Sequence, residues 1–390
     1  MIKSVKLKLK PNIAQRILLA KHIGSNRFVW NYFLNRRKEE YTNNKKTINY
    51  YTCSAELTQL KKQEYYKWLK EVNSQSLQQT LKDLETAYNR FFKRLGNFPK
   101  FKSKDTKNSF RIPQFFELQG RKLKLPKIGL VQIQNRKFEC SEDIKFITIS
   151  RDVTGYYASI TFETDNLAPI HTGKMVGIDL GIKNLAVCSD GTKISNGRYT
   201  KSYARLLRIY QKHLSRKQKG SNKRLRAKYK VAKIHKKISN SRLDATHKFT
   251  TKVVRNNDLI VIEDLNVKGM VKNRKLSKAI QDVSFGEVRR QLEYKSQWYG
   301  KLLIKIDRFF PSSKSCNKCN YINQNLTLSD RDWECPQCAE VLDRDLNASK
   351  NILKEGLRNL SLGTSDYTLR ADVNLNLFES LAMKSEAQYL

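Results

Sequence analysis

Three carboxylates in three separate local signatures constrain this chain most. Asp179 lies in GIDLGIKNLAV, Glu263 in VIEDLNV and Asp345 in DRDLNASKNI. Hard divalent cations bind carboxylate oxygens, and magnesium takes only one or two of them per ion. Two such cations, about 4 Å apart, can stabilise both the attacking and the leaving oxygen when a phosphodiester is cut. A chain that uses its carboxylates in this way must fold so that three distant segments meet.

The charge of the chain indicates which phosphates are involved. It has 76 Lys and Arg against 36 Asp and Glu, a net charge of +40, which attracts polyanions and makes binding salt-dependent. A hydrophobic fraction of 39% is sufficient for buried cores. No apolar run approaches the roughly 20 residues of a membrane span, and the basic N-terminus lacks the features of a signal peptide. We therefore expect a cytoplasmic, nucleoid-associated protein, although basicity alone also fits a structural RNA-binding protein.

Four of the seven cysteines form a regular pattern. Cys316 and Cys319 lie in CNKC, and Cys335 and Cys338 lie in CPQC, with fifteen residues between the two motifs. This spacing is typical of a structural zinc site with four thiolate ligands, whose metal supplies folding energy to a short segment. Two disulfides are the alternative, but a basic chain without a signal peptide indicates a reducing compartment. The remaining cysteines are interpreted as ordinary buried or half-buried thiols: Cys53, Cys140 and Cys188.

The first half of the chain is predicted to be a β-barrel that carries a helical insertion. Residues 2–10 alternate apolar residues with lysines, as a half-exposed strand does, and residues 123–162 hold several short strands. The pattern between them is helical and rich in aromatic residues, with a clear amphipathic helix at Ser76–Leu95. We assign residues 1–10 and 97–168 to the barrel and residues 11–96 to the insertion.

Two basic segments are candidate nucleic-acid contacts. The first interleaves phenylalanines with Lys100, Lys102 and Arg111, and the second runs from Arg205 to Arg255 with a single acidic residue. Aromatic rings can stack on bases and cations can hold phosphates. The alternatives are a basic loop whose aromatics pack inward and a solvated helix face. We favour contact because cations in acid-poor stretches lack protein partners, and from the second segment we select Lys223, Arg224 and Lys233.

The second half is predicted to be an RNase H-like α/β core. Residues 175–189 indicate a strand pair in which Gly177 and Gly181 would leave room beside Asp179 for metal and phosphate. Residues 259–265 indicate a buried strand with Glu263, where an unpaired charge would be costly. A helix, a strand at residues 302–309, the zinc ribbon and a helix with Asp345 follow. The ribbon would thus be inserted before the last helix.

Taken in order, these motifs resemble one family, TnpB, the RuvC-type RNA-guided nucleases of insertion sequences, also named OrfB transposases and related to type V CRISPR effectors. The resemblance covers nearly the whole chain. It rests on KLKLKPNIAQRILLAKHIGSNRFVWN, LQQTLKDLETAYNRFF, FPKFKSK, GIDLGIKNLAV, VIEDLNVKGM and FPSSKSCNKC…CPQC…DRDLNASKNI. The chain departs from the family only mildly, with NASKNI where NAA is common.

The resemblance implies a wedge-like barrel, a helical recognition domain, a RuvC nuclease at residues 169–310 and 343–356 and a zinc-ribbon module at residues 311–342. It implies Asp179, Glu263 and Asp345 as catalytic ligands of two magnesium ions, with manganese as a substitute. Asp343 is the alternative third acid, and Asn347 is expected to support the site. The tail, residues 357–390, is expected to be disordered or dispensable because its composition differs from the rest.

The implied partners are a guide RNA from the transposon's right end, double-stranded target DNA with a short adjacent motif, and the companion transposase of the element. Two other functions remain open at this point. The chain can be a catalytically silent, RNA-guided DNA-binding repressor of the same fold, although such relatives have lost acids. It can also be a DNA transposase, because strand transfer on an RNase H-like fold uses three acids too. The sequence does not distinguish a transposon-borne protein from an early CRISPR effector.

Overall fold

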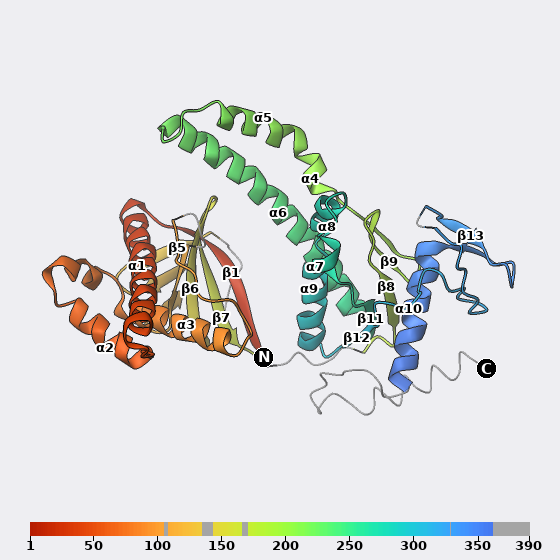
Figure 1. Cartoon of the computed structure of the whole chain (residues 1–390), viewed down its shortest axis with the longest axis horizontal. Helices are drawn as coiled ribbons and strands as arrows, with labels where there is room; N and C mark the ends of the chain where they lie inside the picture. The colour runs from red at the N-terminus through yellow and green to blue at the C-terminus, as the bar shows by residue number, and fades with distance from the viewer. Residues whose placement is uncertain (105–107, 135–142, 166–170, 328, 362–390) are drawn as a thin grey trace. The chain divides into compact units, whose positions relative to one another are not determined.

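The computed structural model describes residues 1–104, 108–134, 143–165, 171–327 and 329–361 (Figure 1). The chain divides into two compact units, with the boundary after Asp165. Of the predicted features, Cys140 and nearly all of the tail lie outside the described residues. Within those residues, no helix is both long and apolar enough to cross a bilayer.

The first unit is built on one antiparallel sheet of seven strands, in the order β2-β6-β7-β1-β5-β4-β3. Alternate side chains, such as Leu7 and Leu9 of the first strand, form its buried core. The described residues show no pairing between the edge strands β2 and β3, so closure into a barrel stays a prediction. The strands are β1 (Ile2–Lys10), β2 (Asn108–Ile112), β3 (Glu117–Gln119), β4 (Lys122–Leu125), β5 (Gly129–Ile133), β6 (Ile144–Asp152) and β7 (Gly155–Glu163).

A helical segment lies between β1 and β2. Asn12 begins its first helix with a capping box, in which its side chain accepts the Gln15 N–H and the Gln15 side chain accepts the Asn12 N–H. Leu19 and Ile23 of this helix pack on the sheet, while its later residues pack on the other helices. The helices are α1 (Ile13–Asn44), α2 (Tyr50–Leu60), the 3₁₀ helix η1 (Glu64–Glu71) and α3 (Ser74–Phe92).

The second unit contains a mixed sheet of five strands, in the order β10-β9-β8-β11-β12. The three strands β8, β11 and β12 run parallel, and β9 and β10 are antiparallel to their neighbours. This mixed sheet agrees with the α/β core that the sequence predicts. The strands are β8 (Met175–Asp179), β9 (Asn184–Cys188), β10 (Lys193–Ser195), β11 (Leu259–Glu263) and β12 (Leu302–Ile306).

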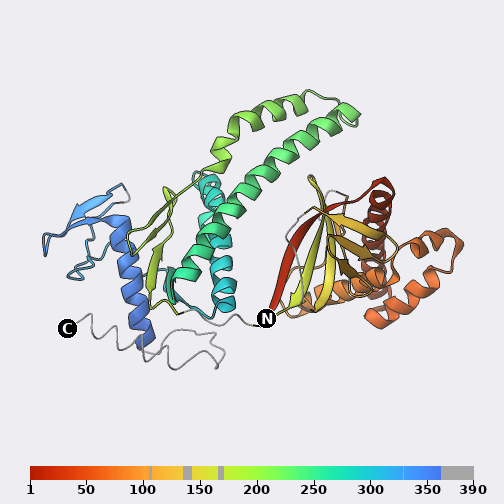
Figure 2. The same cartoon turned by 180° about the vertical axis from the view of Figure 1, so that it is seen from behind.

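Helices cover both faces of this sheet. Val176, Ile178 and Ile260 pack on one side against α6, α8 and α9, whereas Val261 packs on the other side against α10 (Figures 1 and 2). The hairpin of α5 and the first part of α6 extends away from the sheet as an arm. The helices are α4 (Tyr199–Ser202), α5 (Ala204–Ser215), α6 (Asn222–Asn256), α7 (Val267–Met270), α8 (Ser277–Val283), α9 (Phe285–Trp298) and α10 (Arg344–Ser361).

The cysteine-rich segment forms a small module between β12 and α10. Its two short strands, β13 (Asp332–Glu334) and β14 (Val341–Asp343), pair antiparallel. Leu326 and Trp333 pack beside the cysteines in a core of their own. Because α10 begins immediately after β14, the module is tied to the start of the helix that carries Asp345.

Candidate functional site

The strand register brings the first two acids together. In the parallel pair of β8 and β11, Ile178 lies opposite Ile262. Asp179 and Glu263 are the next residues, so they end neighbouring strands, which are about 4.8 Å apart in a sheet. Both side chains lie on the face that α10 covers, because residues two apart on a strand share a face and Val261 contacts α10.

Two glycines let α10 approach this face closely enough to deliver the third acid. A Cβ atom on Gly177 would stand 2.2 Å from the carbonyl oxygen of Ser349 in α10. Likewise, a Cβ atom on Gly356 of α10 would stand 2.5 Å from Val261. The prediction that Gly177 leaves room for metal and phosphate is therefore wrong, since the helix backbone fills that room. Gly181 does not leave open space either, because a Cβ atom on it would stand 3.0 Å from the carbonyl oxygen of Asn184.

The structure gives the two candidate third acids different surroundings. Asp343 accepts the Leu346 N–H at 2.9 Å and pairs with Lys193 at 2.5 Å, so it acts as the N-terminal cap of α10. Asp345 lies in the first turn of α10, lines the same cleft as Asp179 and pairs with Arg331 at 3.2 Å. This geometry supports Asp345 rather than Asp343 as the partner of Asp179.

The acids form a concentrated negative site. Burial, together with the charges of Glu263 and Asp345, raises the pKa of Asp179 to about 7, against the opposing effect of Arg344 and Arg331. Burial also raises the pKa of Glu263, which a hydrogen bond from Ser312 partly offsets. Carboxylates that repel one another in this way are stabilised by a bound cation. Their hard oxygen donors fit magnesium or manganese rather than a soft metal.

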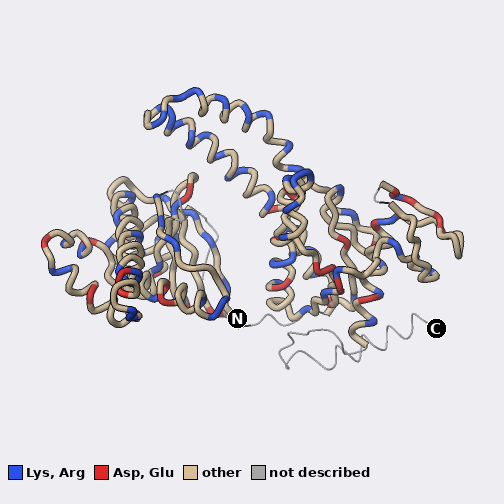
Figure 3. Tube along the Cα trace, viewed as in Figure 1, with Lys and Arg blue, Asp and Glu red and all other residues tan. Residues whose placement is uncertain are grey.

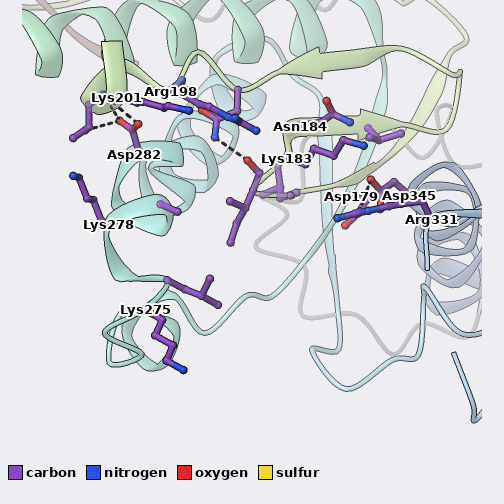
Figure 4. Close-up of a pocket in the computed structure, with 18 of the residues that line it drawn as sticks. Asp179, Lys183, Asn184, Arg198, Lys201, Lys275, Lys278, Asp282, Arg331 and Asp345 are labelled. Atoms are coloured by element: carbon purple, nitrogen blue, oxygen red, sulfur yellow. Dashed lines mark hydrogen bonds and ion pairs between the residues drawn. The ribbon is translucent and has the colours of Figure 1, made fainter. Parts of the chain in front are cut away.

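A cleft of about 930 Å³ opens beside Asp179 and Asp345 (Figure 4). Most of the charged side chains that line it are cationic. In Figure 4, Arg331 lies with the two acids at one end, while Lys275 and Lys278 lie across the cleft. Sequence reasoning missed these cations because they come from separate segments of ordinary composition. They are Lys183, Arg198, Lys201, Lys275, Lys278, Arg331 and Arg344.

The four predicted cysteine ligands converge. Their sulfur atoms all lie within 4.8 Å of one another, with Cys316 and Cys338 at 3.7 Å and Cys319 and Cys335 at 3.5 Å. A tetrahedral zinc ion with Zn–S bonds of about 2.3 Å would hold its ligands about 3.8 Å apart. The described cysteines are free rather than disulfide-bonded. The cluster can therefore hold a structural zinc ion.

Asn347 has a clear role in the structure. It is buried on α10, where its side chain accepts the Asn317 N–H at 2.9 Å and donates to the Ser315 carbonyl at 2.7 Å. Both partners flank Cys316. Asn347 thus fastens the cysteine module to the helix of Asp345, which is how it would support the site.

Two cations of the first basic segment have protein partners, contrary to the expectation that they lack them. That premise is wrong for Lys102, whose ammonium lies 3.6 Å from the centre of the Trp30 ring. It is also wrong for Arg111, which lies over Phe146 and 3.8 Å from Asp83. Aromatic rings and one acid of the first unit thus stabilise these charges internally. Lys100 is exposed.

The first part of the second basic segment forms the arm, in which both helices carry many Lys and Arg residues (Figure 3). Lys223 and Lys233 are exposed on α6, where the Lys233 ammonium lies 5.1 Å from the centre of the Tyr229 ring and still faces solvent. Arg224, in contrast, donates to the carbonyls of Leu214 at 3.0 Å and Lys217 at 2.7 Å, so it holds the end of α5 against α6. The structure therefore leaves Lys223 and Lys233 as better placed for phosphates than Arg224.

Comparisons with known proteins agree with this arrangement. A family model described as "Probable transposase", OrfB of IS605, matches residues 159–274. A Cas12f1-like TNB domain matches residues 285–352, which include the cysteine module. A helix-turn-helix family matches residues 1–46, which form β1 and the single long helix α1 here.

Relatives match over almost the full length. The chain is 38% identical to a "Putative RNA-guided DNA endonuclease" of Streptomyces pristinaespiralis, over 91% of this chain and 89% of the relative. It is 34% identical to the "Putative RNA-guided DNA endonuclease InsQ" of Escherichia coli K12, over 93% of this chain and 94% of the relative.

The fold is similar to that of Cas12f1 in its complex with single-guide RNA and target DNA. The TM-score is 0.53 at 14% identity, covering 90% of this chain and 98% of Cas12f1. This likeness extends the agreement from sequence to fold. From the family match and the near-complete alignments, we conclude that the chain belongs to the TnpB family, the OrfB proteins of IS605-type transposons.

Proposed function

We propose that this chain is an RNA-guided DNA endonuclease of a transposon, which cuts double-stranded DNA beside a short adjacent motif. The observation that carries the proposal is the position of Asp179, which lies next to Glu263 at the ends of neighbouring strands and lines a cationic cleft together with Asp345. Relatives named for this activity align with more than nine-tenths of the chain, which supports the same conclusion.

The chemistry would use two magnesium ions, for which manganese can substitute, held by Asp179, Glu263 and Asp345. When bound, such ions polarise the scissile phosphate and activate a water molecule. The chain's own residues do the rest. Lysines and arginines of the cleft hold the phosphates of the strand to be cut, and α10 fixes Asp345 against the sheet. Arg331 and Arg344 neutralise excess negative charge around Asp345.

The proposed division of labour leaves sequence recognition to base pairing. A guide RNA from the transposon's right end would pair with the target strand, while the protein reads the backbone and the adjacent motif. In this scheme the first unit supplies the wedge-like barrel and the helical recognition domain. The cysteine module, with its zinc ion, serves target binding. A companion transposase remains a further candidate partner, and the cytoplasm, close to the nucleoid, remains the expected location.

The test is to purify the protein from cells that also transcribe its transposon end, sequence the bound RNA and add matched duplex DNA with magnesium. The proposal expects one abundant RNA with a variable end and double-strand cuts at matching targets only. Guided binding without cutting would instead support a repressor. RNA-independent strand transfer would support a transposase. A monomer without nucleic acid and without cutting would contradict the proposal.

A further inference from the structure

A buried chain of hydrogen bonds joins Glu263 to the cysteine module and to α10. It begins at Ser312, whose hydroxyl donates to Oε1 of Glu263 at 2.5 Å. Ser312 is only 7% exposed and lies in the segment that connects β12 with the cysteine module. The remaining oxygen, Oε2, has no hydrogen bond among the described residues, so the serine holds one side of the carboxylate and leaves the other side available.

Two asparagines of α10 hold the backbone that carries Ser312. Asn351, 3% exposed, donates from Nδ2 to the carbonyls of Ser312 at 2.7 Å and Ser315 at 2.6 Å. Asn347 donates to the same Ser315 carbonyl, one residue before Cys316. The segment therefore has little freedom. Its position depends on α10 at one end and on the four cysteines at the other.

We propose that Ser312 is a positioning residue that orients Glu263 for metal binding, and that Asn351 keeps Ser312 in place. This inference rests on the proposed function, because it assigns Glu263 as a metal ligand. A glutamate has three side-chain torsions, and a free carboxylate at the end of β11 would sample several orientations. The Ser312 hydroxyl selects one of them. Contacts that orient a metal ligand contribute roughly 10–100-fold to metal affinity or activity.

The experiment measures Mn²⁺ binding directly, by electron paramagnetic resonance of the free ion, on the purified protein with its RNA. Ser312→Ala should weaken binding about tenfold or more and raise the Mg²⁺ concentration needed for half-maximal cutting by a similar factor. Cutting should recover at saturating Mg²⁺. Ser313→Ala is the matched control, because Ser313 is the next residue in the same segment. This variant should bind Mn²⁺ as the wild type does.

A second pair of variants separates the hydroxyl from packing. Ser312→Thr keeps the hydroxyl, whereas Ser312→Val carries a methyl group where threonine has its hydroxyl. The proposal expects tighter Mn²⁺ binding by the threonine variant than by the valine variant, with one equivalent of zinc in both. Asn351→Ala should weaken Mn²⁺ binding less than Ser312→Ala does.

The outcomes distinguish the inference from the proposed function. If wild type binds Mn²⁺ and cuts, but both serine-to-apolar variants match it, the positioning role is wrong and the nuclease assignment stands. If wild type neither binds Mn²⁺ nor cuts, the proposed function itself is wrong. If the alanine and valine variants both lose zinc while the threonine variant keeps it without any change in Mn²⁺ affinity, Ser312 is a folding residue and the inference fails.

Discussion

Gly177 in β8 lies directly against Ser349 in α10, so closely that a Cβ atom on the glycine would stand 2.2 Å from the serine carbonyl oxygen. The contact sets the height of α10 above the sheet. Asp345 lies one turn before Ser349 on this helix, and Asp179 lies two residues after Gly177 on the strand. The distance between two candidate metal ligands therefore depends on the absence of one side chain.

Replacing Gly177 with alanine should push α10 away from the sheet. We expect a loss of about 1–3 kcal/mol in the free energy of unfolding, as for other overpacked cores, and a fall in cutting rate. Thermal melts and cleavage assays measure the two effects. Gly286→Ala is the control, because the Cβ it adds on α9 would meet nothing within 4 Å. Equal stability and activity of the two variants would contradict the close-packing argument.

The raised pKa of Asp179 predicts a pH-dependent stability in the absence of divalent metal. Its pKa is about 7 in the folded chain against 3.8 as a free group, so the folded state binds more protons between these values. Stability should therefore fall as the pH rises from about 4 to about 7, and the full penalty should persist above pH 7. Asp179→Asn should remove the penalty, raising the melting temperature at pH 8 more than at pH 5.

The exposed residue Asp190 provides the control for this measurement. Its side chain accepts the Thr192 N–H at 2.8 Å, which the Asp190→Asn variant can still do. A stabilisation by Asp179→Asn that is the same at pH 5 and pH 8, or that Asp190→Asn reproduces, would show that the raised pKa of Asp179 is not its cause.

Purified protein should contain about one equivalent of zinc, and Cys316→Ser or Cys335→Ser should release it, because four thiolates hold the metal in such modules. Release should also unfold the module locally and increase its proteolysis. Metal analysis gives the answer, with the buried residue Cys188, replaced by alanine, as a control that keeps zinc. Less than about half an equivalent in the wild type would refute the zinc assignment.

The arm should bind phosphates without base preference. Replacing Lys223 and Lys233 with glutamine should weaken binding to RNA and DNA of every sequence. It should lower the slope of log affinity against log salt by about 0.7–0.9 for each phosphate that the variant no longer neutralises. Lys248→Gln is the matched control on the same helix, because Lys248 already pairs with Asp244 at 2.8 Å. An unchanged slope of log affinity against log salt in the double variant would show that Lys223 and Lys233 do not contact phosphates.

Sequence reasoning predicted the strands that end in Asp179 and Glu263 and the cysteine cluster, because apolar runs and ligand spacings are local signals. It did not predict that Gly177 receives the backbone of α10, since that contact joins segments far apart in the chain. The same reason explains why Lys275 and Arg331, which line the cleft, were missed. For Lys102, the acid-poor context was misleading because an aromatic ring, rather than a carboxylate, is its partner.

The central claim is that Asp179, Glu263 and Asp345 form one metal-dependent nuclease site. The direct measurement is cutting of a matched duplex in magnesium by Asp179→Asn, Glu263→Gln and Asp345→Asn, with guided DNA binding measured on the same samples. Each variant should cut more than about 100-fold more slowly, which exceeds the loss expected from removing a contact that only orients a metal ligand. Each should still bind the guided DNA target. Asp343→Asn, which keeps a capping side chain, should still cut. Near-normal cutting by any of the three variants would contradict the account.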